Sequence, residues 1–220
     1  GTTMTALPSR DSSTEISPGI HWIKGALNET GHAYILEGLE GNYLLGVSRD
    51  LTDNVLIEKF QPYRILCIGD RHHGKSAARQ LCKQVNRGIT CSEIESVKLG
   101  KGVTVEQALP MAQTSLFEDL IALPTPGHTP GALSYLFVQE SHCALFMGDT
   151  ICPVDGTWRY WVSSKNLPQF IKSIESLDGD YDLMVGNSFA CSPLPYVKGK
   201  AAVRNILEGL VKTARAKMGR

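Results

Sequence analysis

The chain of 220 residues is 42% hydrophobic and 20% charged, which is ordinary for a soluble globular protein with a substantial core. Lysine and arginine together number 22, as do aspartate and glutamate, so the charge balance gives no indication of a nucleic-acid partner. The sequence contains no run of about 18 apolar residues, which predicts that the chain does not cross a membrane.

The N-terminal end and the cysteines bear on domain organisation and location. Residues 1–18 are polar and contain two prolines. We expect this segment to be poorly ordered, and residues 19–220 to form one domain. The six cysteines include no C-x-x-C pair. Buried, reduced cysteines are typical of cytosolic proteins, so we expect a cytoplasmic location.

Short apolar runs bounded by turn residues open the chain. They predict strands at residues 21–23, 32–36, 42–47 and 64–68. The last of these runs is apolar almost throughout, which is typical of a fully buried strand. Apolar residues then recur at helical spacing and predict a helix that begins near Lys75 and ends before Gly88.

The second half of the chain repeats this order. Its periodicity predicts strands at 119–123, 133–138, 144–147 and 182–185, and helices over 167–177 and 203–214. Both halves thus contain hairpin strands, a strand–loop–helix unit and a final helix. This pattern predicts an α+β fold, a layered sandwich with helices outside two sheets.

Candidate functional side chains follow the ends of predicted strands. Asp70, His72 and His73 come after the strand at 64–68, and Asp149 after the strand at 144–147. His128 lies between two strands on a loop rich in proline and glycine. Loops held by a rigid scaffold are where active sites tend to lie. Imidazoles and carboxylates gathered in this way are typical of a metal site.

Three motifs in a fixed order carry a family resemblance. The chain reads D-x-H-H-G-K-S-A, then T-P-G-H-T-P-G, then F-M-G-D-T. This order resembles the metallo-β-lactamase superfamily over residues 19–218. The resemblance implies a four-layer αβ/βα sandwich with a metal site at one edge, between the sheets. It also implies hydrolysis of an ester, thioester, amide or phosphoester with one or two metal ions, usually zinc and sometimes iron or manganese.

The first motif of that family, H-x-H-x-D-H, is only partly kept. Carried over residue by residue, its first histidine falls on Asp70 and its second on His72. Its aspartate falls on Gly74 and its last histidine on Lys75. The first metal position therefore keeps more of its ligands than the second.

The remaining ligand positions also divide in this way. The histidine of the next loop falls on His128, the bridging aspartate on Asp149, and the closing histidine near Asn187. The resemblance therefore implies at most one ion, zinc or iron, with ligands at Asp70, His72, His128 and Asp149. Lys75 stands where a second ion would lie. We expect it to pair with Asp149, and with Asp70, because converging carboxylates need a positive charge.

Two interpretations stay open at this stage. In the first, the protein hydrolyses a small ester, thioester or phosphoester, with Asp149 orienting or deprotonating a water and Lys75 stabilising the oxyanion. In the second, the site is empty, the charged groups form a structural network, and the protein is a metal-free, inactive binding or regulatory module. His73 is an alternative to His72 in the site, because neighbouring loop residues can exchange places.

An aromatic segment follows the bridging aspartate. Trp158, Arg159 and Trp161 form a platform suited to a planar or anionic ligand, and His73 and Asn187 complete the predicted pocket. Alternatively, the two tryptophans cover the edge of a sheet. We expect a small-molecule substrate or ligand, with an anion as one option, and neither nucleic acid nor membrane as partner. Homo-oligomerisation is left open.

Overall fold

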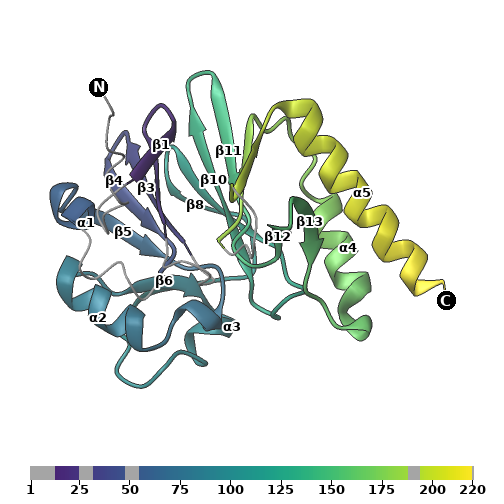
Figure 1. Ribbon diagram of the computed structural model, residues 1–220. Helices are drawn as coiled ribbons and strands as arrows, with labels where there is room; N and C mark the ends of the chain where they lie inside the picture. Colours follow the sequence, from purple (N-terminus) through teal and green to yellow (C-terminus); the bar gives the residue numbers. More distant parts are fainter. Residues whose placement is uncertain (1–12, 25–31, 48–54, 188–193, 220) are drawn as a thin grey trace, which may run out of the picture.

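The computed structural model describes residues 13–24, 32–47, 55–187 and 194–219. Two β-sheets lie against each other in the middle of the molecule, and helices flank them on the outer sides (Figure 1). Helices α1 (Val55–Lys59) and α2 (Ser76–Val85) lie outside the first sheet, and α4 (Leu167–Glu175) and α5 (Lys200–Met218) lie outside the second. This arrangement confirms the predicted α+β sandwich.

The first sheet has seven strands among the described residues, in chain order from β1 to β7. Strands β1 to β4 are antiparallel, and β4 to β7 are parallel. They are β1 (Ser13–Ser17), β2 (Ile20–Ile23), β3 (Ala33–Gly38), β4 (Gly41–Leu45), β5 (Tyr63–Cys67), β6 (Ile89–Ser92) and β7 (Val105–Leu109).

The second sheet has six described strands in the order β15-β14-β11-β10-β9-β8. They are β8 (Thr114–Phe117), β9 (Leu120–Pro124), β10 (Leu133–Gln139), β11 (His142–Phe146), β14 (Leu183–Val185) and β15 (Tyr196–Lys198). A separate hairpin is formed by β12 (Ile151–Val154) and β13 (Thr157–Tyr160).

The helices other than α3 (Glu93–Ser96), which lies beside β6 and β7, cover the outer faces of the sheets. The helices are α1 (Val55–Lys59), α2 (Ser76–Val85), α3 (Glu93–Ser96), α4 (Leu167–Glu175) and α5 (Lys200–Met218), with short 3₁₀ turns η2 (Arg71–His73) and η3 (Ser164–Asn166). Helix α2 ends at Asn86, whose φ of 53° is the left-handed conformation common after a helix end.

Three apolar clusters hold these layers together. Tyr34 and Phe137 belong to the cluster between the two sheets. Ile35 belongs to the cluster under α1 and α2, and Phe170 to the cluster under α4 and α5. Because Tyr34 and Ile35 are neighbours on β3 and point to opposite faces, this strand is buried on both sides. That explains why its sequence is an almost continuous apolar run.

Hydrogen bonds join the two sheets at the edge where the candidate site lies. The Leu133 amide donates to the Gly69 carbonyl at 2.9 Å. The Tyr135 hydroxyl donates to the Ile68 carbonyl at 2.7 Å. The buried Tyr34 hydroxyl donates to the Gly186 carbonyl at 2.6 Å. These bonds fix the ends of strands from both sheets relative to one another, so the loops that follow start from a rigid frame.

The structure confirms the strands and helices predicted above and corrects the N-terminal segment. Residues 1–18 were expected to be poorly ordered, but Ser13–Ser17 forms β1 and pairs with β2. The reason is burial: Ile16 is only 2% exposed and belongs to the cluster between the sheets. Residues 1–12 of the predicted segment lie outside the described residues.

No helix in the described ranges is both long and apolar enough to cross a membrane. The cysteines in these ranges, Cys67, Cys82, Cys91, Cys143 and Cys152, are all free thiols. Cys191 lies outside the described residues.

Candidate metal site

Asp70 follows β5 and caps the short turn η2. Its Oδ1 atom accepts a hydrogen bond from the backbone N–H of His72 at 2.7 Å. Such a cap satisfies an amide at the start of a helical turn and fixes the carboxylate. The same oxygen lies 3.2 Å from Nδ1 of His72. Asp70 is 2% exposed, so its negative charge is held close to the imidazole that follows it.

His128 lies on the loop between β9 and β10. Its Nδ1 atom donates to the backbone carbonyl of Trp161 at 2.8 Å. A carbonyl only accepts, so this bond places a proton on Nδ1 and leaves Nε2 as the atom that faces Asp70, 3.8 Å from its Oδ2. Metal-binding histidines are commonly oriented by such a bond from the other ring nitrogen.

Asp149 follows β11, in a turn that needs the preceding glycine. Gly148 has a φ of +58°, in the left-handed region that favours glycine. Oδ2 of Asp149 lies 2.7 Å from Nε2 of His73. Both side chains are largely buried, at 14% and 8% exposure. Asp149 therefore has a close cationic partner within the chain.

The four predicted metal ligands meet in space. One ligand atom from each of Asp70, His72, His128 and Asp149 lies within 4.8 Å of the others. The rings of His72 and His128 are 5.2 Å apart. The four ligand candidates come from three loops that follow different strands, as the motifs predict. His73 also faces the site, but it pairs with Asp149 and does not replace His72.

Burial and charge act together on these groups. Burial would raise the pKa of Asp70, but hydrogen bonds from His72 and the charges of nearby histidines lower it. The pKa of His72 is raised by its bond to Asp70. Burial would lower the pKa of His73, but the charge and hydrogen bond of Asp149 raise it to about 9. His73 is therefore an imidazolium at neutral pH in the protein without metal.

The expected ion pair of Lys75 is not formed. Lys75 is the N-cap residue of α2, and its exposed Nζ donates to the Lys98 carbonyl at 3.4 Å. The cation beside Asp149 is His73 instead. The predicted roles of Lys75, in offsetting the carboxylates and in stabilising an oxyanion, are therefore not retained.

The aromatic segment is the hairpin β12–β13, and its side chains diverge. Trp158 packs against the apolar cluster under α4 and α5, in agreement with the alternative that it covers a sheet. Arg159 is exposed. Trp161 is 48% exposed, and it reaches the site through the carbonyl that binds His128. The hairpin thus holds a metal-ligand candidate in place rather than presenting one continuous platform.

Asn187 lies next to the turn that carries Asp149. It is 6% exposed, and its backbone N–H donates to the Gly148 carbonyl at 3.0 Å. It also lines a small cavity of about 10 Å³ together with Gly46 and Gly69. The residue at the family's closing-histidine position is therefore close to the site, as the sequence predicts.

One histidine near the site was not predicted from the sequence. His32, just before β3, is 3% exposed. Burial lowers its pKa to about 4, although the charge of Asp149 acts in the opposite direction. His32 has no motif around it, and only the fold shows that it lies within the field of Asp149.

Replacing His32 with asparagine is expected to reduce the loss of unfolding free energy at acid pH. Because its pKa is 6.5 in the unfolded chain and about 4 in the fold, stability from this group is present above pH 6.5 and is lost as the pH falls towards 4. The loss at the lower pH is about 3 kcal/mol. Urea unfolding of both proteins across this range measures it, and equal losses in the two would contradict the assignment.

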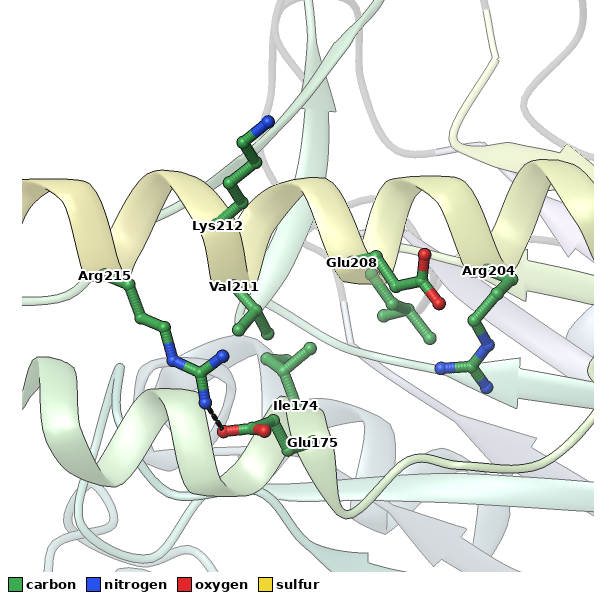
Figure 2. A pocket seen from close by; sticks show the side chains of 8 residues that line it. Ile174, Glu175, Arg204, Glu208, Val211, Lys212 and Arg215 are labelled. Carbon is green, nitrogen blue, oxygen red and sulfur yellow. Dashed lines mark hydrogen bonds and ion pairs between the residues drawn. The ribbon is translucent and has the colours of Figure 1, made fainter.

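A larger hollow lies elsewhere, between α4 and α5 (Figure 2). Its volume is about 410 Å³, and apolar and charged side chains of both helices line it. Arg215 bonds Glu175 across it at 2.6 Å. The predicted site residues, all of which the structure describes, do not line this hollow. It is therefore separate from the candidate metal site.

Comparison with known proteins shows similarity in sequence over part of the chain. No protein-family model matches the chain. Over 83 residues it is 40% identical to the hydroxyacylglutathione hydrolase of Bartonella quintana, a match that covers 36% of this chain. The match covers 31% of that relative, so the chain spans about a third of its length.

Solved structures match over nearly the whole chain. The β-lactamase from Chitinophaga pinensis has a TM-score of 0.67 at 12% identity and covers 98% of both chains. The MIM-2 metallo-β-lactamase has a TM-score of 0.66 at 16% identity, over 91% of this chain and 87% of that chain. The chain therefore has the metallo-β-lactamase fold that its sequence motifs predict.

Proposed function

We propose that the protein is a hydrolase that uses one metal ion, zinc or iron, to hydrolyse a small thioester. The observation that carries the proposal is the convergence of Asp70, His72, His128 and Asp149, with ligand atoms within 4.8 Å of one another. The thioester is inferred from the hydroxyacylglutathione hydrolases that resemble parts of the chain. The sequence alone leaves esters, thioesters and phosphoesters open as substrates, and the similarity to these relatives favours the thioester.

The groups present fit such an ion. Two imidazoles and two carboxylates are a suitable ligand set for zinc or iron. Oδ1 of Asp149 is buried and, within the described part of the chain, has no hydrogen-bond partner. A buried acceptor without a donor costs free energy. A cation bound beside Asp149 would remove that cost.

The chain's own residues support the chemistry in distinct ways. A bound ion of this kind lowers the pKa of a water molecule and polarises a carbonyl. The His73 imidazolium holds Oδ2 of Asp149, which leaves Oδ1 as the atom that would bind the ion and orient the attacking water beside it. The Trp161 carbonyl keeps His128 in one orientation. Water then adds to the thioester carbonyl, the C–S bond breaks, and an acid and a thiol are released.

A second candidate function is a metal-free binding or regulatory module on the same fold. It is favoured by the internal compensation of charge: Asp149 lies 2.7 Å from His73, and Asp70 lies 3.2 Å from His72. These pairs balance both carboxylates without an ion. In that case the four side chains would form a structural network, and a small molecule would bind without being hydrolysed.

Metal content and stability separate the two candidates. Protein purified without chelator is expected to hold close to one ion and to hydrolyse small thioesters, and chelation should abolish the activity. Because bound metal stabilises the native state, zinc or iron at about 100 times its dissociation constant should add about 2.7 kcal/mol to the unfolding free energy of the stripped protein. Less than about 0.1 mole of metal per mole, with no stabilisation by zinc, iron or manganese, would favour the binding module.

A further inference from the structure

The carboxylate of Glu95 is fully buried and bonds to two of the three loops of the candidate metal site, those that carry Asp70 and His128. Its Oε1 accepts from the backbone N–H and from Nε of Arg71, each at 3.0 Å. Its Oε2 accepts from Nη2 of Arg71 at 2.7 Å and from the backbone N–H of Gly131 at 3.1 Å. Each oxygen thus receives two donors, which is the full capacity of a carboxylate.

Glu95 is itself held in one position. It belongs to α3, which follows β6, and its backbone N–H donates to the Ser92 hydroxyl at 3.1 Å. This cap fixes the start of the short helix. The carboxylate is therefore presented from the frame of the first sheet, and the two loops are fixed against it.

The loop that carries His128 approaches Glu95 as closely as a backbone can. A Cβ atom at Gly131 would lie 2.4 Å from Oγ of Ser92 and 2.8 Å from Oε2 of Glu95. Any side chain there would push this loop away. Glycine at this position thus allows the backbone N–H to reach the carboxylate.

Arg71 transmits this restraint to the other loop, because it stands between Asp70 and His72 in the chain. Its guanidinium binds Glu95 through two parallel bonds, a geometry that lysine cannot reproduce. If the loops separated, a buried carboxylate would lose its donors, which is strongly unfavourable. The bonds between Glu95, Arg71 and Gly131 therefore hold the two loops at one spacing.

We propose that Glu95 and Arg71 are positioning residues that set the separation of Asp70 and His72 from His128, and thereby the affinity for the metal. The effect on affinity rests on the proposed function, whereas the effect on loop spacing does not. Neither residue needs to touch substrate or metal. Residues that orient metal ligands typically change metal affinity by about 10- to 100-fold when they are replaced.

The test compares Glu95→Gln with a matched control, Glu106→Gln. Glu106 accepts from Nη1 of Arg87 at 2.8 Å and from the Gly88 amide at 3.2 Å, so it also binds an arginine and a backbone amide, away from the site and with a side chain that is 39% exposed. We expect Glu95→Gln to raise the zinc dissociation constant about 10- to 100-fold and Glu106→Gln to leave it unchanged. Arg71→Lys, which keeps the charge, should also weaken zinc binding, and it carries the test if Glu95→Gln does not fold.

Hydrogen exchange of the metal-free proteins gives a second, independent result. Backbone amides of residues 70–74 and 127–131 should exchange faster in Glu95→Gln or Arg71→Lys than in wild type and Glu106→Gln. Folded variants with wild-type zinc affinity and unchanged exchange in both segments would overturn the proposal. If wild type binds no zinc, the proposed function fails, and the exchange rates alone support or overturn the positioning role.

Discussion

Replacing His128 with asparagine is expected to remove the metal ion and to lower thioester hydrolysis by at least about 100-fold. His128 is a direct ligand in the proposed site, and even residues that only orient ligands change affinity by up to about that factor. An asparagine side chain cannot place one atom where Nε2 of His128 lies and also keep the bond to the Trp161 carbonyl that orients the ring. Metal content by elemental analysis and initial rates of hydrolysis measure the two effects.

His142→Asn is the matched control for this variant. His142 begins β11, the strand whose far end leads to Asp149, and its Nε2 lies 3.2 Å from Oγ of Ser17. We expect this control to keep both metal and activity. If His128→Asn retained one equivalent of metal and the wild-type rate, the proposed ligand set would be incorrect.

Replacing His73 with leucine is expected to destabilise the metal-free protein by about 3–5 kcal/mol, because the change leaves the buried charge of Asp149 without its partner. Both side chains are largely buried, and the contact is 2.7 Å long. Chemical unfolding of the stripped protein measures the loss. Saturating zinc or iron should recover part of it, since an ion beside Asp149 replaces the missing positive charge.

A pair with one well-exposed partner provides the comparison for His73. His21 lies 3.1 Å from Glu37, whose side chain is 48% exposed, so His21→Leu should cost no more than about 1 kcal/mol. A His73→Leu protein as stable as wild type would show that the pair with Asp149 contributes little. If added metal did not reduce the destabilisation, the ion would not bind beside Asp149 in place of His73.

The sequence predicted the elements whose burial produces a clear period. Helices α2, α4 and α5 each bury one apolar face, and β3 to β5 are apolar because both of their faces are covered. The strand β7 gave no such signal, since four of its five residues are exposed. Its pairing with β6 is decided by the sheet and not by its own composition.

The hairpin β12–β13 is a different case, because the sequence did contain its signal. Asp155 and Gly156 form its turn, with φ values of 51° and 80°. Asp-Gly between short apolar segments is the strongest local indication of a hairpin. The sequence left open whether the aromatic residues form a ligand platform or cover the edge of a sheet, and Trp158 is part of the core packing.

Sequence motifs could predict which residues approach one another but not how they pair. The four ligand candidates follow strand ends, and strand ends can be inferred from periodicity. The partner of Asp149 depended on the turn η2, which directs His73 to Asp149 and leaves Lys75 at the exposed start of α2. His73 and Lys75 are two positions apart, and their spacing in the sequence does not show which of them contacts Asp149.

The role of Glu95 could not be predicted from the sequence, for a related reason. Its partners Arg71 and Gly131 are 24 and 36 residues away in the chain. An acidic residue at the start of a short helix is ordinarily explained by the helix dipole. Only the packing of α3 between two distant loops shows that this carboxylate bonds to both.

An anomalous-scattering map from crystals of the zinc-loaded protein tests the central claim most directly. A single peak is predicted, coordinated by Asp70, His72, His128 and Asp149, with Lys75 not in contact. The absence of a peak at this position, or a peak that none of these four side chains reaches, would contradict the account.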